Sequence, residues 1–458
     1  MENINFLGEK RLEMLFDEGT FVELGAFATN RASTLTEEEH QCQGDGVTTG
    51  YGKINGRVSF AFSQNIRVMS GSFGEIHGKK IVNIIRKAID TKSPIICILN
   101  SKGIRLQEGI RALQVYNEIY LDLIKCTNIP VITLVIGENT GLQSFLLPFS
   151  DFVIMEQDSS ISVNNRNVVS AFEKMDLKDF GNESQHSKNN NCHFISDNTA
   201  DSFGRIREVL EFLPPTTRAI QRFEPTDNIK PLDFKMENFY FENIAKNIFD
   251  ETIEYSKMEN KNVYTAFGEI LGYRVGIVAN DEEYNGGALT SKGIKKISDF
   301  INLCNKFNIP IITFVNTPGI YPSYKDECDD LLSNTKDLLT SYSNSKRKIT
   351  IYMNKAYGNG FNLMCPKEMG ADVVFAWHTA EISILGPESV VNVLYNNEIK
   401  NADDPLKIKS EYLEYYKNNF TTPLAGGKMG ILDNIINYKD TKLALVDSLA
   451  LITSKLTQ

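Results

Sequence analysis

One turn pattern occurs twice in the sequence, as Gly52-Lys53-Ile54-Asn55-Gly56 and as Gly268-Glu269-Ile270-Leu271-Gly272. The numbering of the two copies differs by 268 − 52 = 216. The same offset takes Gly71 to Gly287, Pro94 to Pro310, Asn100 to Asn316, and Gly103-Ile104 to Gly319-Ile320. Because glycine, proline and asparagine control backbone direction, these matches predict one backbone path used twice. We therefore interpret the chain as an internal duplication, and we expect its function where the halves meet.

Strand, turn and helix alternate in each half. Asn55-Gly56 lies between two apolar runs within residues 47–62, and this dipeptide is the strongest short signal for a β-hairpin. Unbroken apolar strands follow, opened by Pro94 and Pro130 in the first half and by Pro310 in the second. Because such strands alternate with helical segments, the fold class that we predict is α/β, with parallel strands buried on both faces.

Breaks in this pattern suggest the domain boundaries. We expect an N-terminal domain at 1–215, which closes at a Pro-Pro pair, a linker at 216–240 and a C-terminal domain at 241–458. Residues 156–200 show no periodicity, and we expect a mobile surface loop within them at 186–193, where the composition is of low complexity.

Bulk properties exclude several classes of protein. The net charge is 48 − 58 = −10, which argues against a nucleic-acid partner because such proteins carry a basic patch. The seven cysteines form no Cys-x-x-Cys pair and the five histidines fall mostly in polar loops, so we expect neither a disulfide framework nor a metal site. No signal-peptide pattern and no apolar run of membrane-spanning length occurs, so we expect a cytoplasmic location.

Two glycine turns offer chemistry through the backbone, at residues 137–142 and 357–360. Each ends an apolar strand and begins a helix, where N–H groups point outward together in the positive field of the helix start. Adjacent N–H groups can hold a developing oxyanion, an effect worth about 3 kcal/mol per donor. The alternative is that these glycines only permit a tight turn, but their equivalent places in a duplication favour a catalytic role. The candidate catalytic residues are Gly141, Leu142, Gly358, Asn359 and Gly360.

A set of strings spread over the chain is specific in combination. These strings are Gly44-Asp45-Gly46-Val47-Thr48-Thr49-Gly50, Phe60-Ala61-Phe62-Ser63-Gln64-Asn65, Arg105-Leu106-Gln107-Glu108-Gly109, Asn308-Ile309-Pro310-Ile311-Ile312-Thr313-Phe314-Val315, Thr317-Pro318-Gly319, Lys355-Ala356-Tyr357-Gly358 and Thr379-Ala380-Glu381-Ile382. On these residues the sequence resembles the carboxyltransferase component, of β-subunit type, of biotin-dependent acyl-CoA carboxylases such as propionyl-CoA carboxylase, and of the related decarboxylases. The similarity runs from about residue 10 to the C-terminus.

This resemblance implies two tandem crotonase-like domains, with active sites where the first domain of one subunit faces the second domain of another. The first domain would bind the CoA thioester, and the second would admit carboxybiotin from a carrier protein. The biotin anion would take the α-proton of the thioester, so neither a side-chain base nor a metal is required. The resemblance assigns the biotin oxyanion to the amides of Gly141 and Leu142, and the thioester enolate oxygen to those of Asn359 and Gly360.

Further site residues and partners follow from the same resemblance. On the acyl-CoA side they are Gly71, Ser72, Phe73, Lys102, Gly103, Ile104 and Arg105. On the biotin side they are Gly286, Gly287, Ala288, Gly319 and Ile320. Arg105 could pair with a phosphate, or instead with Glu108 three residues on. The expected partners are biotin carboxyl carrier and biotin carboxylase subunits, or a membrane decarboxylase complex, and the expected assembly is a homo-oligomer (a dimer or a trimer of dimers) or a hetero-oligomer with a homologue.

Several positions depart from the family pattern and keep other hypotheses open. The family's Asp-Ser-Gly-Gly is Asn100-Ser101-Lys102-Gly103 here, its Gly-Gly pair is Gly141-Leu142, and its Gly-Gly-Ala is Gly358-Asn359-Gly360. The Leu142 side chain could occupy space that a biotin ring needs. The first hypothesis is a carboxyltransferase that moves a carboxyl group between carboxybiotin and the α-carbon of a CoA thioester. The second is a degenerate structural or regulatory subunit paired with an intact homologue, and the third is a crotonase-type hydrolase or lyase without biotin.

Overall fold

The computed structural model of the chain describes residues 6–30, 42–213, 231–232, 239–328 and 330–454. The chain divides into two compact units, Met1–Thr217 and Arg218–Gln458. Most of the linker that we predict at 216–240 lies outside the described residues. The first helix of the second unit begins at Phe241, the residue at which we predict the second domain to begin.

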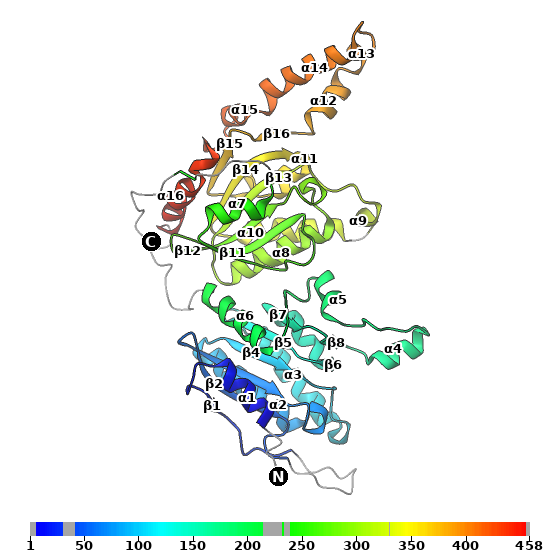
Figure 1. Cartoon of the computed structure of the whole chain (residues 1–458), viewed down its shortest axis with the longest axis vertical. Helices are drawn as coiled ribbons and strands as arrows, with labels where there is room; N and C mark the ends of the chain where they lie inside the picture. The colour runs from blue at the N-terminus through cyan, green and yellow to red at the C-terminus, as the bar shows by residue number, and fades with distance from the viewer. Residues whose placement is uncertain (1–5, 31–41, 214–230, 233–238, 329, 455–458) are drawn as a thin grey trace. The chain divides into compact units, whose positions relative to one another are not determined.

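The first unit is built on a seven-stranded sheet in the order β1-β2-β3-β4-β5-β7-β9 (Figure 1). The first two pairings are antiparallel, and every pairing from β3 to β9 is parallel. A short parallel pair of β6 and β8 lies off this sheet. The strands are β1 (Val22–Glu23), β2 (Val47–Ile54), β3 (Arg57–Gln64), β4 (Ile95–Leu99), β5 (Val131–Val135), β6 (Glu138–Thr140), β7 (Phe152–Glu156), β8 (Ser160–Ser162) and β9 (Phe194–Ser196).

Helices cover both faces of this sheet. Ile95, Cys97 and Leu99 alternate along β4 and pack in one core cluster with α2 and α3, while Ile96 and Ile98 between them are buried as well. Each fully buried Ile or Leu stabilises the fold by about 1.5–3 kcal/mol, which accounts for the unbroken apolar sequence of the strand. The helices are α1 (Phe6–Leu15), α2 (Glu75–Thr91), α3 (Ile110–Ile124), α4 (Arg166–Glu173), α5 (Glu183–Lys188) and α6 (Thr199–Phe212), with 3₁₀ turns η1 (Met69–Gly71), η2 (Leu106–Glu108) and η3 (Leu142–Phe149).

The second unit repeats this sheet in the order β10-β11-β12-β13-β14-β15-β17, with β16 paired to β14. The strands are β10 (Glu251–Glu254), β11 (Val263–Ile270), β12 (Tyr273–Asn280), β13 (Ile311–Thr317), β14 (Lys348–Tyr357), β15 (Val373–Trp377), β16 (Glu381–Ser383) and β17 (Asn434–Ile436). As in the first unit, the hairpin strands pair antiparallel and the strands that follow pair parallel. The predicted α/β class and its duplication are therefore confirmed.

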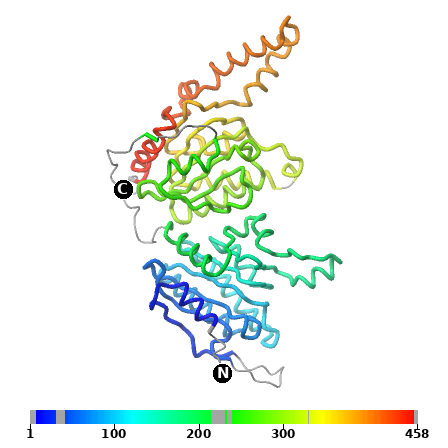
Figure 2. The backbone as a smooth tube through the Cα atoms, in the orientation of Figure 1, coloured from blue at the N-terminus to red at the C-terminus, as the bar shows by residue number. Residues whose placement is uncertain are grey.

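The helices of the second unit include an arm that doubles back on itself and extends away from the sheet, formed by α12, α13 and α14 (Figure 2). We predict residues 402–455 as helical with an interruption at 425–430; the structure places α14, α15 and α16 there, but α15 includes residues 425–428, and the strand β17 separates α15 from α16. The helices are α7 (Phe241–Ile248), α8 (Ser291–Lys306), α9 (Tyr324–Cys328), α10 (Leu331–Asn344), α11 (Gly358–Leu363), α12 (Pro387–Leu394), α13 (Asn396–Lys400), α14 (Pro405–Tyr416), α15 (Pro423–Lys428) and α16 (Thr441–Ser454), with turns η4 (Asn285–Gly287), η5 (Lys367–Met369), η6 (Lys417–Thr421) and η7 (Tyr438–Asp440).

The offset found in the sequence holds in the bounds of the elements themselves. Adding 216 to the bounds of β2 (47–54), β3 (57–64) and η1 (69–71) gives the bounds of β11, β12 and η4. After β4 the offset changes by one, since β5 begins at Val131 and β14 begins at Lys348 (348 − 131 = 217). The repeated glycines and prolines of the sequence therefore mark a repeated backbone.

A buried lysine is part of the duplicated structure, and the sequence analysis missed it. Lys80 donates from Nζ to the carbonyl oxygens of Gly44 and Val47, and Lys296 (80 + 216) donates to those of Glu259 and Val263. Burial lowers the pKa of each lysine to about 8. Each lysine thus ties the helix that follows the hairpin, α2 or α8, to the start of that hairpin.

The loop expected at 186–193 is correct only in part, because residues 186–188 belong to α5 while residues 189–193 lie in no helix or strand, and its mobility stays a prediction. Residues in and around it form α5 and β9, and the Nδ1 atom of His193 accepts a hydrogen bond from the Val153 N–H at 3.0 Å. Burial lowers the pKa of His193 to about 4. The expectation that the histidines lie in polar loops also fails for His77, which is fully buried within α2. α5 and β9 are too short to show a hydrophobic period, which explains why the sequence pattern missed them.

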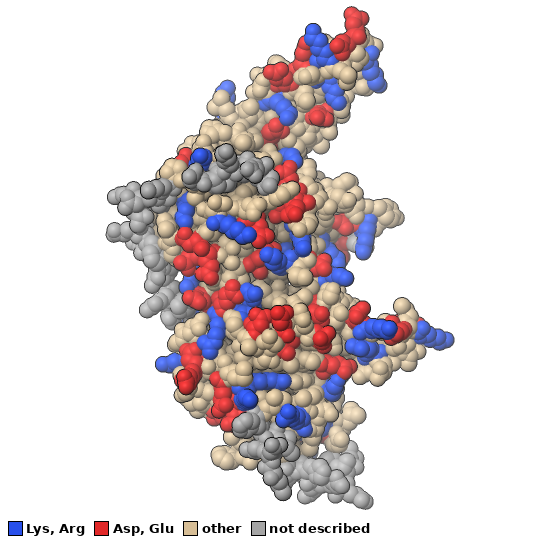
Figure 3. Space-filling view, in the orientation of Figure 1, with Lys and Arg blue, Asp and Glu red and all other residues tan. Residues whose placement is uncertain are grey.

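Charge is spread over the units. On the face that Figure 3 shows, Lys and Arg alternate with Asp and Glu over each unit, and no broad basic area stands out, in keeping with the net charge of −10. Within the described residues, no helix has both the length and the apolar character that crossing a membrane would require.

Candidate functional site

In the first unit, the turns that follow β4 and β6 meet. A Cβ atom built on Gly141 would lie 3.6 Å from the Cα atom of Gly103, and one built on Gly103 would lie 3.4 Å from the carbonyl oxygen of Thr140. Gly103 has φ +114° and Gly141 has φ +92°, values that favour glycine strongly. The carboxyl ends of these parallel strands therefore bring two of the predicted site residues together, as expected for ligand sites in α/β folds.

The structure corrects which amides of the first turn are available. The Gly141 N–H donates to the carbonyl oxygen of Ser162 at 2.9 Å, so it cannot serve as one of the two oxyanion donors that the sequence suggested. The turn η3 begins at Leu142, and the first N–H groups of a helix have no partner within it. The adjacent N–H groups at the start of this turn are those of Leu142 and Gln143.

Leu142 packs inward. Its side chain is partly buried against the core cluster of the first unit, and its carbonyl oxygen accepts a hydrogen bond from the Tyr120 hydroxyl at 2.8 Å. Leu142 is not among the described residues with positive φ, whereas Gly141 is. The conformation that needs glycine thus falls on the retained Gly141, and the replacement of the second family glycine by leucine leaves the turn intact.

The equivalent turn of the second unit follows β14. Tyr357 pairs with Ser383 as Thr140 pairs with Ser162, so Gly358 corresponds to Gly141. The predicted donors Asn359 and Gly360 consequently correspond to the corrected pair of the first unit, and they lie in the first turn of α11.

Close packing fixes the glycines of this second turn. Gly358 has φ +50°, and a Cβ atom on Gly360 would lie 2.6 Å from Cγ2 of Thr317 and 3.1 Å from Cα of Gly319. Gly319, predicted on the biotin side, therefore lies against the catalytic candidate Gly360 within the same unit.

A second pair of loops completes each edge. A Cβ atom on Gly71 would lie 2.3 Å from the carbonyl oxygen of Asn100, and one on Gly287 would lie 2.2 Å from that of Asn316. Both glycines have positive φ, so neither loop accepts a side chain there. Backbone bridges extend the contact in both units: Phe73 pairs with Ile104, and Leu289 pairs with Ile320. The predicted acyl-CoA-side residues therefore gather at one edge of the first sheet, and the biotin-side residues at the same edge of the second.

The two predicted cations differ in their surroundings. Lys102 is exposed and pairs with Glu138, and this hydrogen bond holds the pKa of Glu138 below its usual range. Arg105 is 4% exposed, and its Nη1 atom donates to Asp45 at 2.6 Å and to Glu108 at 2.7 Å. The suggested contact of Arg105 with a phosphate is thus replaced by the alternative pairing with Glu108, because burial commits the guanidinium to protein groups.

A polar cluster beside the second turn was missed by sequence reasoning. The Tyr357 hydroxyl donates to Glu381 at 2.6 Å, and Lys417 pairs with the same carboxylate at 3.0 Å. Burial and the adjacent carboxylate raise the pKa of Tyr357. The sequence offered one sign of this cluster, since Tyr357 and Glu381 both lie within the quoted motif strings. Nothing in those strings indicates that the two side chains are in contact.

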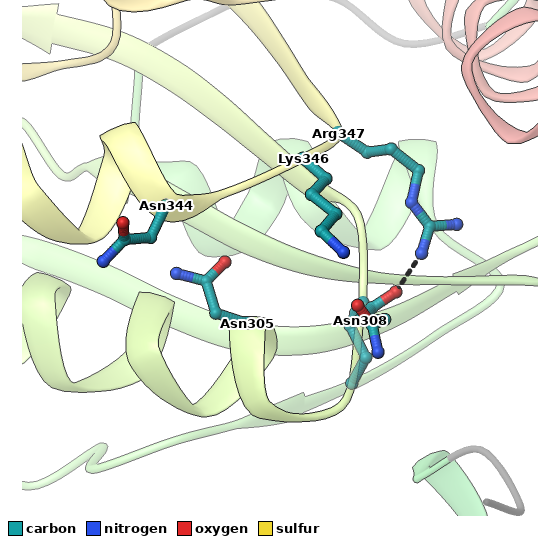
Figure 4. A pocket seen from close by; sticks show the side chains of 6 residues that line it. Asn305, Asn308, Asn344, Lys346 and Arg347 are labelled. Atoms are coloured by element: carbon teal, nitrogen blue, oxygen red, sulfur yellow. Dashed lines mark hydrogen bonds between the residues drawn. The ribbon is translucent and has the colours of Figure 1, made fainter. Parts of the chain in front are cut away.

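A small pocket in the second unit lies away from these turns. It is lined by residues that precede β13 and β14, among them Asn308 and Lys346, whereas the turns follow the carboxyl ends of these strands (Figure 4). Arg347 donates to the carbonyl oxygen of Asn308, and Lys348 donates to that of Tyr342 at 2.9 Å. Cations beside carbonyl groups at helix C-termini are ordinary caps, so this pocket has a structural explanation.

Comparison with known proteins agrees with this geometry. The model of the carboxyl transferase domain family matches residues 5–458. The propionyl-CoA carboxylase carboxyltransferase subunit of Haloferax mediterranei is 32% identical over 97% of this chain and 90% of its own length. The methylmalonyl-CoA decarboxylase subunit alpha of Propionigenium modestum is also 32% identical, over the same shares.

A solved structure shares the fold. The transcarboxylase 12S crystal structure, described as a hexamer with methylmalonyl-coenzyme A and methylmalonic acid bound, is 30% identical. It has a TM-score of 0.92 and covers 98% of this chain and 89% of its own. The resemblance inferred from the motif strings is confirmed, and so is the crotonase-like fold that it implies.

Proposed function

Because the chain belongs to the carboxyl transferase domain family, we propose that it is the carboxyltransferase component of a biotin-dependent acyl-CoA carboxylase or decarboxylase. The observation that carries this proposal is the pair of equivalent turns, each with two adjacent amides at the start of a helix. Gly141 and Gly358 hold these turns in the required backbone conformation. The chain supplies amides at the place where the reaction develops negative charge.

The residues divide by unit as the resemblance implies. In the first unit, the loop of Gly71 to Phe73 and the turn of Gly103 and Ile104 line the path of the acyl-CoA. The amides of Leu142 and Gln143 hold the ureido oxygen of biotin. Biotin itself supplies or accepts the carboxyl group when its carrier is bound. The amides of Asn359 and Gly360 hold the enolate oxygen of the thioester.

The substitutions at positions 142 and 359 disturb the two turns less than the sequence suggested. The Leu142 side chain packs against the core of its own unit, so the substitution leaves the adjacent amides in place. Asn359 is exposed and follows Gly358, the residue of that turn with positive φ. These two observations weigh against the degenerate-subunit hypothesis, which rested on the loss of glycine at these positions.

Assembly and partners are part of the proposal. α3 carries exposed apolar side chains at Ile110, Leu113, Leu121 and Ile124, a spacing that lines one side of a helix. Such a stripe is typical of a protein interface, and it supports an oligomer in which the first unit of one subunit faces the second unit of another. We place biotin carboxyl carrier and biotin carboxylase subunits, or a membrane decarboxylase complex, beside this oligomer in the cytoplasm.

The test uses the full chain with free biotin in place of the carrier. Conversion of methylmalonyl-CoA to propionyl-CoA is followed with and without biotin, together with the binding of propionyl-CoA by calorimetry. We expect biotin-dependent turnover and binding of the thioester. Absence of both, with malonyl-CoA and methylmalonyl-CoA alike, would leave the degenerate-subunit hypothesis in its place.

A further inference from the structure

A buried ion network in the first unit joins two of the motif strings, residues 44–50 and 105–109, to the loop that contains Ser72. Arg105 lies at its centre: Nη1 donates to Asp45 and Glu108, Nε donates to the Ser72 hydroxyl at 3.3 Å, and Nη2 donates to the Ser72 carbonyl at 2.8 Å. Asp45 is fully buried and also accepts the His77 N–H at 2.7 Å. Removing one member would leave a buried charge uncompensated, which is costly.

This network holds the two loops that we assign to the acyl-CoA. The Phe73 N–H donates to the Gly103 carbonyl at 2.9 Å, and the Arg105 N–H donates to the Phe73 carbonyl at 2.8 Å. Glu108 accepts the N–H of Glu75, the first residue of α2, where the helix start favours a negative charge. The guanidinium therefore fixes the loop of Ser72 and Phe73 to the turn after β4.

The second unit shows that the fold does not require such a network. When 216 is added to each number, Arg105 becomes Tyr321, and Asp45, Glu108 and Ser72 become Lys261, Tyr324 and Ala288. The same backbone pairing is nevertheless present. The Leu289 N–H donates to the Gly319 carbonyl at 2.9 Å, and the Tyr321 N–H donates to the Leu289 carbonyl at 2.8 Å.

The unit that carries the network is the first unit, whose loops we assign to the path of the acyl-CoA. We propose that Arg105 is a positioning residue for acyl-CoA binding, acting through Ser72 and Phe73 rather than by touching the ligand. This inference rests on the proposed function, because it takes the first unit as the thioester side. By fixing the loop before the ligand arrives, the network removes the entropic cost of ordering it during binding.

The experiment compares Arg105→Gln with Arg207→Gln in the full chain. Arg207 makes an ion pair with Asp17 at 2.7 Å and donates to the Leu15 carbonyl. Arg207→Gln is therefore a matched control, since it also removes a guanidinium that is anchored by protein groups. We expect Arg105→Gln to raise the Kd for propionyl-CoA at least tenfold while the KM for free biotin stays within twofold. Amide hydrogen exchange at Phe73 should accelerate at least tenfold, and that at Leu289 should not change. Arg207→Gln should stay within threefold of wild type in both measurements.

Each outcome decides the matter. If wild type binds propionyl-CoA and Arg105→Gln leaves either the Kd or the amide exchange at Phe73 unchanged, the positioning role is overturned and the proposed function stands. Wild type that neither binds the thioester nor turns it over overturns the proposed function, and the positioning role with it. Should Arg105→Gln not fold, Glu108→Gln removes one anchor of the same guanidinium, and a rise in Kd below threefold for that variant counts against the proposal.

Discussion

The Tyr120 hydroxyl donates a hydrogen bond to the carbonyl oxygen of Leu142 at 2.8 Å. This bond joins the middle of α3 to the first residue of η3, where we place one oxyanion donor. Because the Leu142 carbonyl is part of the peptide group between Leu142 and Gln143, this hydrogen bond fixes the plane of that peptide group. The position of the catalytic amides thus depends on a side chain from a different helix, well before them in the sequence (142 − 120 = 22).

We expect Tyr120→Phe to destabilise the chain by about 1 kcal/mol, because the Leu142 carbonyl loses its donor. Tyr116→Phe is the matched control, since its hydroxyl is buried without a hydrogen-bond partner in the described part of the chain. That control should be neutral or stabilising. Denaturant unfolding of the two variants measures the difference, and equal stabilities would contradict the role given to Tyr120.

Neighbouring glycines in the second unit test the close approach of the loops. Gly287→Ala places a methyl group 2.2 Å from the Asn316 carbonyl oxygen at φ +79°, whereas Gly286→Ala at φ +60° meets nothing within 4 Å. Positive φ costs roughly 1 kcal/mol for either alanine, and the clash adds about 1–3 kcal/mol only at Gly287. Thermal unfolding should therefore rank Gly287→Ala well below Gly286→Ala, and the reverse order would refute the packing described for this loop.

The buried lysines give a pH dependence with a definite sign. In the unfolded chain Lys296 has the ordinary pKa of 10.5, and in the fold burial lowers this pKa to about 8. Between these values the unfolded state binds more protons, so the free energy of unfolding rises with pH from about 8 to 10.5. Lys296→Met should flatten this rise, whereas Lys295→Met, at a more exposed position, should not. A rise that is unchanged in Lys296→Met would show that burial does not lower the pKa of Lys296.

Much of the fold could be predicted from the sequence because the duplication repeats the glycine, proline and asparagine residues that mark turns and strand starts. The hairpins and the strands opened by Pro94 and Pro310 recur at the offset of 216, the glycine turns recur at 217, and the structure places them at equivalent positions. The doubled string Lys79-Lys80-Ile81 and Lys295-Lys296-Ile297 was available at the same offset but passed unnoticed, because lysine is usually a surface residue.

Parts of the site could not be predicted because they depend on contacts between residues that are distant in the sequence. Arg105 and Asp45 are far apart in the numbering (105 − 45 = 60), and no local pattern shows that they pair. The identity of the available amides depends on Ser162, whose carbonyl occupies the Gly141 N–H. Such pairings follow from the tertiary fold rather than from spacing along the chain.

The most direct test of the account is the rate of biotin-dependent conversion of methylmalonyl-CoA to propionyl-CoA by Leu142→Pro, compared with Leu142→Ala. Proline is tolerated in the first turn of a helix and removes the N–H there, whereas alanine keeps the N–H and loses only core packing. Loss of one oxyanion donor costs roughly a hundred- to a thousandfold in rate, so we expect that loss for Leu142→Pro and less than a tenfold loss for Leu142→Ala. Equal rates in the two variants and wild type would contradict the claim that backbone amides at this turn perform the chemistry.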